Sequence, residues 1–256
     1  MIVLGFDTST RATAVALRLP DGVGVEARDD PPAGAHPGHA TRLLDMAGQL
    51  LSDAGIAWSE VDRVAVGLGP GTFTGLRVGV ATARGLAQSL GVELVGVPST
   101  LALSMPALAS ERLDAILAAD GRDGAVLAAI DARRGEVFAA VYEAGEQDTP
   151  RELAPPRALP PQEISSAIAE ATAAAGGEGL SLLAVGDGAV RFRAQLEAAG
   201  AHVEPDSSPL HLVSANAICA LGELADAQGL QEILPDYRRR PDAELALEGS
   251  TAAGGA

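Results

Sequence analysis

The hydrophobic positions of this chain divide it into short strands and longer amphipathic helices. Near the start, three apolar segments are separated by polar and turn residues, a pattern typical of an antiparallel meander. From Ala40 the apolar residues recur at i, i+3 or i+4 and i+7, the spacing of one helical face, and this pattern ends at Gly55. The elements predicted for the first half are strands at Ile2–Phe6, Thr13–Leu19 and Val23–Ala27, a helix at Ala40–Ala54, a strand at Val61–Gly67, a helix at Thr74–Leu90, a strand at Glu93–Val97 and a helix at Thr100–Ala109.

The second half repeats the strand, strand, helix, strand, helix order without sequence identity to the first half. A hairpin leads to Leu153 and a cluster of four prolines, to which no element is assigned. Further elements are predicted as strands at Ala125–Ile130 and Glu136–Tyr142, a helix at Glu163–Ala175, a strand at Leu182–Gly186 and helices at Val190–Ala199 and Val213–Ala227. The chain is therefore predicted to be an α/β protein with two related halves. Residues 241–256 are small, acidic and unpatterned, and we expect them to form a flexible tail.

Composition narrows the class of protein. With 256 residues, 47% of them hydrophobic, the chain can bury a core in one large or two modest domains. Its 18 basic residues are all arginine and its 34 acidic residues bring the net charge to −16, which disfavours binding to nucleic acid without a partner. No apolar run approaches the ~20 residues that span a bilayer, and the first residues lack a basic leader. We expect a cytoplasmic protein with no membrane contact.

The single cysteine and the histidines do not form a metal-binding pattern. Cys219 has no second cysteine with which to make an internal disulfide, and we expect it to be a small buried helix residue. His36 and His39 are separated by a Pro-Gly pair, which disfavours a preformed pair of metal ligands on a helix. The sequence therefore predicts no metal site.

The glycine-rich segment at residues 67–79 follows a strand and opens a helix, a location that favours an anion. It matches neither standard phosphate loop, because no lysine follows a glycine and Thr72 and Thr74 stand where a third glycine would be needed. Two interpretations stay open. Gly69, Gly71 and Thr72 could contact an anion, or the segment could be a turn that only caps the helix.

Small residues recur every four positions along the following helix and would let another backbone approach closely. Glycine inside a helix costs ~1 kcal/mol relative to alanine, so close packing has to offset that cost. The stripe could pack against the Ala40–Ala54 helix, or the two helices together could form a surface for a partner subunit. The residues expected at that surface are His39, Leu43, Leu44, Leu50, Gly75, Gly79, Ala83 and Ala87.

Five motifs occur in order along the chain. They are FDTST at residues 6–10, HATRLL at 39–44, GPGTFTGLRVG at 69–79, LAAIDARRGEVFAAVYE at 127–143 and PDYRRR at 235–240. With these motifs the sequence resembles the bacterial TsaB (YeaZ) family of tRNA threonylcarbamoyladenosine biosynthesis proteins, from residue 2 to about residue 242. The resemblance implies an actin-like, Hsp70-like and sugar-kinase-like fold built from two duplicated βββαβαβα domains. The expected domains are residues 1–101 and 102–212, with 213–240 packing back on the first.

The resemblance also implies a role beside other proteins. Members of the family act with a catalytic paralogue, TsaD, and a small ATPase, TsaE, and reach tRNA through that complex; a homodimer is expected for the isolated chain. The paralogue holds its metal with two histidines, and the matching positions here are Ser99 and Leu103. A hydroxyl and an isobutyl group cannot replace two imidazole ligands, so we expect a non-catalytic subunit.

Nucleotide binding is the other question that the resemblance raises. Kinases of this superfamily hold phosphate with an Asp-x-Gly-Thr turn, but here Ser9 replaces the glycine. Asp7, Thr8, Ser9 and Asp131 remain candidates for polar contacts, although Asp7 could instead cap its turn. Two arginines follow Asp131 where a run of glycines would be expected. We expect no independently bound cofactor, with ATP or ADP only within the complex; the alternative is an independent ATP-dependent phosphotransferase.

Two further segments carry candidate contacts. Gly186 to Gly188 follow a strand where such folds often meet adenosine, or form a simple strand-to-helix turn. The basic cluster near the C-terminal end is either a solvated turn or a contact to the partner subunit or an RNA phosphate. That cluster consists of Arg238, Arg239 and Arg240.

Overall fold

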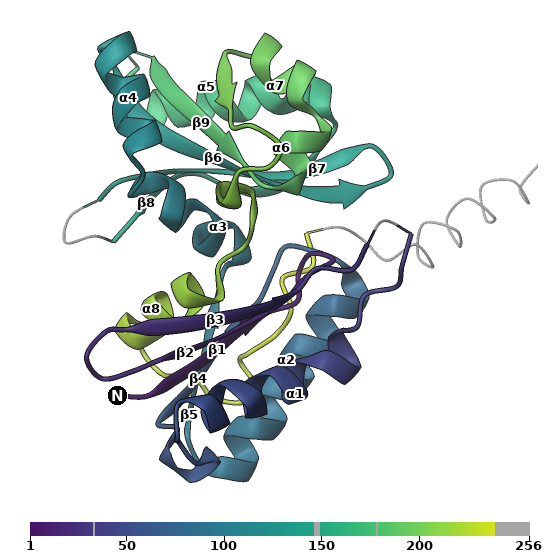
Figure 1. The fold of residues 1–256 in the computed structure, drawn as a ribbon. Helices are drawn as coiled ribbons and strands as arrows, with labels where there is room; N and C mark the ends of the chain where they lie inside the picture. The colour runs from purple at the N-terminus through teal and green to yellow at the C-terminus, as the bar shows by residue number, and fades with distance from the viewer. Residues whose placement is uncertain (33, 146–148, 178, 239–256) are drawn as a thin grey trace, which may run out of the picture.

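The computed structural model describes residues 1–32, 34–145, 149–177 and 179–238, and it contains two five-stranded mixed sheets (Figure 1). The first sheet has the strand order β3-β2-β1-β4-β5 and the second has the order β10-β9-β6-β7-β8. In each sheet the first three strands of the half pair antiparallel, and the next two add in parallel beside the first strand. The two halves therefore share one topology, the duplicated βββαβαβα arrangement of the actin-like, Hsp70-like and sugar-kinase-like fold.

The bounds of the elements agree with most of the predicted strands and helices. The strands of the first sheet are β1 (Val3–Asp7), β2 (Thr13–Arg18), β3 (Gly24–Asp29), β4 (Arg63–Gly67) and β5 (Glu93–Val97). Those of the second sheet are β6 (Asp123–Arg133), β7 (Glu136–Glu143), β8 (Arg151–Leu159), β9 (Leu180–Val185) and β10 (Ala201–Val203). The α-helices are α1 (His39–Asp53), α2 (Phe73–Leu90), α3 (Ser99–Leu108), α4 (Glu111–Asp120), α5 (Ile164–Ala174), α6 (Asp187–Arg191), α7 (Arg193–Ala198) and α8 (Ala215–Leu224).

Three elements were not predicted. β8 contains Pro155 and Pro156, which argued against a strand, but it lies at the edge of its sheet, where a missing N–H is tolerated. Its pairing with β7 shifts register near these prolines. α4 begins at an N-cap, Ser110, whose hydroxyl accepts from the Leu113 N–H, and β10 is a three-residue strand at the other edge. The predicted helix at 190–199 is two helices, α6 and α7.

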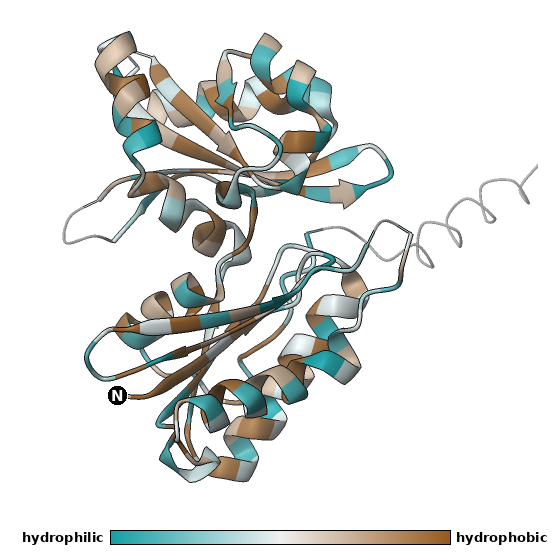
Figure 2. Cartoon of the chain, viewed as in Figure 1, coloured by the Kyte–Doolittle hydropathy of each residue, from teal (hydrophilic) through white to brown (hydrophobic). Residues whose placement is uncertain are grey.

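The helices form layers around the sheets (Figure 1). α1 and α2 cover the outer face of the first sheet, and α5 and α7 cover that of the second. α3 and α8 lie between the sheets, and each packs mainly on the sheet of the other half: α3 on β6 and α8 on β1 and β2. Hydrophobic residues gather on the strands and on the inner helix faces (Figure 2). The central core therefore belongs to both halves. The domain boundaries given above stay a prediction.

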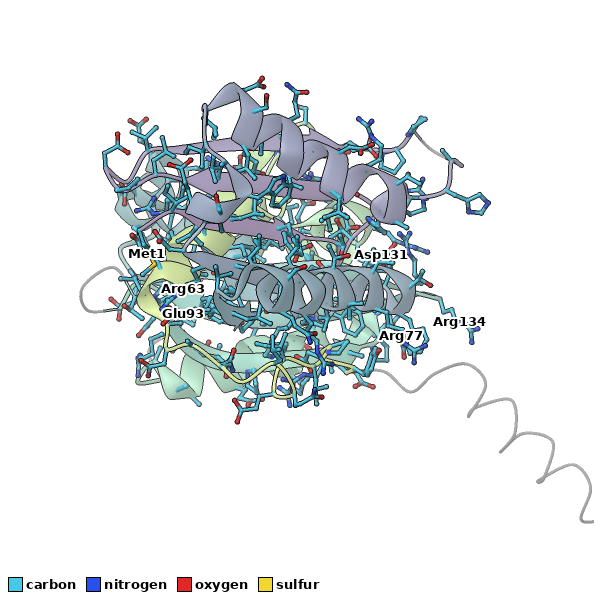
Figure 3. The ribbon with its side chains drawn as sticks, turned by 90° about the horizontal axis from the view of Figure 1, so that it is seen from below. Met1, Arg63, Arg77, Glu93, Asp131 and Arg134 are labelled. Atoms are coloured by element: carbon cyan, nitrogen blue, oxygen red, sulfur yellow. The ribbon has the colours of Figure 1, made fainter. Side chains whose placement is uncertain are left out.

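Two contacts fix α8 in this central layer. Cys219 is buried, with Sγ 3.5 Å from the carbonyl oxygens of Val3 and Ala16. The buried Arg63 side chain donates to the carbonyls of Gly222 and Ala225 at the end of α8 and pairs with Glu93 (Figure 3). A cation at a helix C-terminus is favourable because the last carbonyls lack helical partners. None of the helices in the described ranges combines the length and the hydropathy of a membrane-spanning segment.

Candidate functional site

The turn after β1 is the centre of a buried polar network. Asp7 is 1% exposed, and its Oδ1 accepts from the backbone N–H of Ser9 at 2.8 Å and from the Ser9 hydroxyl at 2.6 Å. Its Oδ2 accepts from the hydroxyl of Ser99, at the start of α3. Both carboxylate oxygens are therefore engaged by donors of the chain itself, and the turn-capping interpretation of Asp7 fits this geometry.

The glycine-rich loop packs against this turn. Thr72 N–H donates to the Ser9 carbonyl at 2.7 Å, and Gly69 N–H donates to the Ser99 hydroxyl at 3.0 Å. A Cβ on Gly71 would overlap the backbone of Ser9, so this position has room only for glycine. The structure thus brings together the predicted anion contacts of both segments, and the N–H groups of Thr72 and Gly69 donate to oxygen atoms of the chain itself. The predicted contacts in this network are Asp7, Thr8, Ser9, Gly69, Gly71 and Thr72.

The stripe of small residues on α2 faces the interior. Thr8 donates its hydroxyl to the Gly75 carbonyl at 2.8 Å, and a Cβ on Gly79 would overlap Thr8 Oγ1. A Cβ on Gly75 would overlap the Thr8 carbonyl oxygen. Ala83 and Ala87 are likewise buried, in the core beneath α2. This arrangement does not fit the predicted partner-facing stripe: the glycines admit the turn after β1, and no partner helix can use the same space.

The predicted interface residues of α1 divide into buried and exposed positions. Leu43 is buried in the core between the first sheet and helices α1 and α2, which we call the first core. Leu50 is half-buried, and Leu44 is 48% exposed. His39 is buried at the start of α1, where its Nδ1 lies 2.9 Å from Thr13 Oγ1. Leu44 is thus the predicted interface residue whose side chain reaches the surface most clearly.

Burial sets the charge state of His39. It lowers the pKa of the imidazole below its ordinary value of 6.5, and the nearby Asp7 carboxylate offsets part of this effect. Among the residues that the structure describes, the His39 Nε2 has no hydrogen-bond partner at normal geometry. A neutral imidazole is therefore favoured at the junction between α1 and the turn after β1.

Asp131 lies in the second half, apart from the Asp7 network. Its Oδ1 accepts from Arg133 N–H, and its Oδ2 accepts from Arg191 at 2.8 Å and from the Arg133 guanidinium at 3.1 Å. Arg133 and Arg134 both have positive φ in the β6–β7 turn. The Asp131 N–H donates to Asp187, at the start of α6, and burial raises the pKa of Asp187 above its ordinary value. Asp131 is therefore an ion-paired carboxylate at a tight turn.

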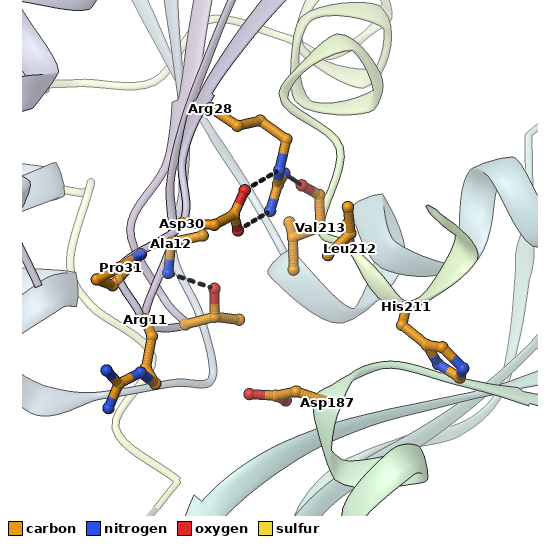
Figure 4. A pocket seen from close by; sticks show the side chains of 10 residues that line it. Arg11, Ala12, Arg28, Asp30, Pro31, Asp187, His211, Leu212 and Val213 are labelled. Atoms are coloured by element: carbon orange, nitrogen blue, oxygen red, sulfur yellow. Dashed lines mark hydrogen bonds and ion pairs between the residues drawn. The ribbon is translucent and has the colours of Figure 1, made fainter. Parts of the chain in front are cut away.

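A cavity of about 190 Å³ separates the β1–β2 turn from α6 (Figure 4). Arg11 and Asp187 line it from opposite halves, and His211 lies at its far side. The His211 Nδ1 accepts from Gly186 N–H, which assigns the ring proton to Nε2, next to the carbonyls of Glu204 and Pro205. Both Gly186 and Gly188 lie close to the Ala129 carbonyl oxygen. A Cβ on Gly186 would lie 2.0 Å from this oxygen, and a Cβ on Gly188 would lie 2.8 Å from it. The turn at 186–188 is thus set by packing against β6.

The fit to a magnesium nucleotide is poor. Such a ligand would need free carboxylate oxygens and an open phosphate turn, whereas Asp7 and Asp131 are already bonded to the chain's own donors. Within the described ranges, no group of three or more His, Cys, Asp or Glu residues could hold a metal ion.

The sequence did not predict the contacts of some residues that organise this region. Ser99 was noted only as a replaced ligand, yet it joins Asp7 to Gly69, and the next residue, Thr100, lies 2.9 Å from the hydroxyl of Tyr142 in β7. The sequence signal that could have identified these two residues is a pair of polar residues at the start of a predicted helix. Arg238 pairs with Asp236 at 2.6 Å, whereas Arg239 and Arg240 lie outside the described residues.

The comparisons with known proteins agree on one family. The family model described as TsaD, tRNA N6-adenosine threonylcarbamoyltransferase, matches residues 31–247. The chain is 34% identical to the tRNA threonylcarbamoyladenosine biosynthesis protein TsaB of Escherichia coli, over 57% of each chain. It is 32% identical to TsaB of Bacillus subtilis, over 56% of each. These matches thus span little more than half the length of the curated relatives.

A solved structure extends the similarity over the whole fold. YeaZ from Pseudomonas aeruginosa superposes with a TM-score of 0.71 and 28% identity, covering 92% of this chain and 99% of that one. Its coverage includes both halves, so the duplicated topology and the sequence matches point in the same direction. The chain belongs to the family that the threonylcarbamoyltransferase model describes, and within it to the TsaB/YeaZ group.

Proposed function

We propose that this chain is a non-catalytic subunit of the complex that forms threonylcarbamoyladenosine in tRNA. In this role it supports transfer of the threonylcarbamoyl group from threonylcarbamoyl-adenylate to the adenosine next to the anticodon, in tRNAs that read codons beginning with A. Its family membership supports the pathway, because the curated relatives are named for the biosynthesis of this nucleoside.

The observation that carries the non-catalytic role is the structure around Ser99 and Leu103. Ser99 is fully buried and its hydroxyl is shared between Asp7 and Gly69, while Leu103 is 1% exposed and packs against Gly186. A hydroxyl already bonded on both sides and an aliphatic side chain cannot ligate a metal. The locus at which the paralogue would hold its metal is a packing centre in this chain.

The proposed partners are the catalytic paralogue TsaD and the ATPase TsaE, in the cytoplasm. The exposed side of α1 and α2 is the proposed contact surface, with Leu44 as its predicted apolar residue. The isolated chain is proposed to pair with a second copy when the partner is absent, since an unpartnered surface can pair about a two-fold axis. tRNA is reached through the complex, in keeping with the net charge of −16.

The phosphotransferase alternative gains little from the geometry. It requires the Asp7 or Asp131 carboxylate at the phosphates, and both accept hydrogen bonds or ion pairs from the chain's own residues. We propose that no nucleotide binds the isolated chain, and that ATP or ADP is bound only in the complex. Calorimetry with millimolar ATP tests this directly: a binding isotherm for the chain alone would restore the alternative.

The proposed function is tested by threonylcarbamoyl transfer to tRNA in a reconstituted mixture. The mixture is assayed complete, with this chain omitted, and with this chain as the only protein. We expect product in the complete mixture, none on omission and none with the chain alone. Unchanged transfer on omission would contradict the proposed role.

A further inference from the structure

Two exposed aromatic side chains lie together on the surface of this protein, whose other aromatic residues are buried or half-buried. The chain has four Phe, two Tyr and one Trp, and the two whose side chains are exposed are Phe73, at 39%, and Tyr237, at 44%. Their ring centroids are 5.1 Å apart, although the residues are far apart in sequence. Exposed single apolar residues are common, but a paired aromatic surface is typical of a binding anchor.

Arg77 completes this cluster. Its guanidinium carbon lies 3.8 Å from the centre of the Phe73 ring, and its Nε donates to the Tyr237 hydroxyl at 2.9 Å. The Arg77 side chain is exposed, and among the described residues neither of its Nη atoms has a hydrogen-bond partner. An arginine held by stacking is pre-organised and loses little side-chain freedom on binding an acceptor.

The cluster is fixed by the segment that follows α8, residues 226–238. This segment crosses the open edge of β5, where Gln228 N–H donates to the Leu94 carbonyl and the Gln228 side chain accepts from Gly96. Ile233 is fully buried in the first core. Asp236 N–H then donates to the Leu68 carbonyl at 2.7 Å, immediately before Tyr237. The backbone that carries Tyr237 is therefore held in place by hydrogen bonds and by the burial of Ile233.

We propose that Phe73, Arg77 and Tyr237 form an anchor for a partner protein whose contacting segment places a carboxylate on Arg77 and an apolar side chain against Phe73. The inference rests on the proposed function, under which that partner is the catalytic subunit. The combination of Phe, Tyr and Arg is enriched at the centres of protein interfaces. The two Nη atoms of Arg77, which bond to no described residue, form a fork of donors that a carboxylate matches in charge and geometry.

The charges of the chain distinguish between three possible ligands of the cluster: RNA, a second copy of the chain and a different protein. At −16, the protein repels an RNA backbone at long range, which disfavours RNA as the ligand of this cluster. A two-fold dimer centred on the cluster would bring the Arg77 side chains of both copies together, and like charges in contact oppose binding. A different protein that places a single carboxylate on Arg77 brings neither a phosphate backbone nor a second Arg77 to the cluster.

The test is calorimetric affinity of the full chain for the purified catalytic subunit. We expect Arg77→Ala and Phe73→Ala to weaken binding at least tenfold, and Arg77→Glu to weaken it further. Arg151→Ala is the control: Arg151 is an exposed arginine on β8 in the second half, away from α1 and α2, where it pairs with Glu143. It removes one positive charge and should change the affinity less than twofold.

The outcomes separate the anchor from the proposed function. If the wild-type chain binds the catalytic subunit and the Arg77 and Phe73 variants bind as Arg151→Ala does, the anchor is wrong and the proposed function stands. If the wild-type chain does not bind at all, the proposed function fails with it. Loss of tRNA affinity or of self-association in Arg77→Ala, with subunit affinity unchanged, would assign the cluster to RNA or to a second copy and overturn the proposal. Thermal unfolding of each variant shows that the compared proteins are folded.

Discussion

The inward orientation of the small-residue stripe on α2 can be tested with two glycines of the same helix. Gly79 lies over Thr8 and has no room for a Cβ, whereas no described residue outside the adjacent helix backbone comes within 4 Å of a Cβ on Gly85. Both positions are in the helix interior, so replacement by alanine should gain ~1 kcal/mol of helix propensity at each. The difference between the two variants then measures the packing against Thr8.

The magnitudes follow from the contacts. In Gly79→Ala, the new methyl group has to displace the Thr8 side chain, and overpacking of this kind costs about 1–3 kcal/mol. Moving Thr8 also breaks its bond to the Gly75 carbonyl, and an unsatisfied buried polar group costs about 1–3 kcal/mol. After the gain in propensity, we expect Gly79→Ala to lower the free energy of unfolding by about 1–5 kcal/mol. Gly85→Ala should raise it by about 0.5–1 kcal/mol.

Urea unfolding, followed by circular dichroism and by the fluorescence of Trp58, gives both values. Trp58 packs against the core that α1 and α2 share, so it reports on this half. A Thr8→Ala substitution should relieve the overlap, and the double variant Thr8→Ala/Gly79→Ala should be more stable than the sum of the single effects by about 1–3 kcal/mol. If Gly79→Ala is as stable as Gly85→Ala, the stripe does not pack against Thr8 and is free for a partner.

Three further predictions follow from buried groups. Burial raises the pKa of the Cys219 thiol to about 12, so a disulfide reagent should leave it unmodified in the native protein at pH 8 and label it fully in urea; rapid native labelling would contradict its burial. Because burial lowers the pKa of His39 below 6.5, the unfolded chain takes up the proton first, and stability should be complete above pH 6.5 and fall as the pH drops below it. Urea unfolding between pH 7.5 and 5 should show this loss reduced in His39→Asn and unchanged in the control His36→Gln; equal profiles for all three would refute it. Arg63→Ala should lower the free energy of unfolding by about 2–3 kcal/mol in the same assay, because the carbonyls at the end of α8 lose their donor, and an unchanged midpoint would show that water replaces it.

The pattern of the sequence predicted most of the fold because its strands and helices have clear periodicities. The β1–β2–β3 meander, α1 and α2 lie within a few residues of their predicted bounds. β8 was missed because its two prolines oppose a strand in general, and only its place at the sheet edge makes them acceptable. The edge position depends on pairing with β7, which no local pattern encodes.

The candidate site was harder to predict because its contacts join distant segments. Periodicity placed Gly75 and Gly79 on one face of α2 but could not say whether that face meets a partner or the turn after β1. Phe73 and Tyr237 are separated by most of the chain, and their contact depends on the path of residues 226–238 across β5. From the sequence, Ser99 was considered only as a residue that cannot replace a metal-binding histidine of the paralogue. In the structure, its hydroxyl donates to the Asp7 carboxylate.

The most direct test of the central claim is a titration of this chain into a fixed amount of the catalytic subunit, with TsaE, tRNA and threonylcarbamoyl-adenylate in excess. A non-catalytic subunit that acts by binding should raise the rate of threonylcarbamoyl transfer linearly up to a fixed ratio of the two chains and then leave it constant. A rate that keeps rising in proportion to this chain, beyond any fixed ratio and independently of the amount of catalytic subunit, would show that the chain itself carries out the chemistry.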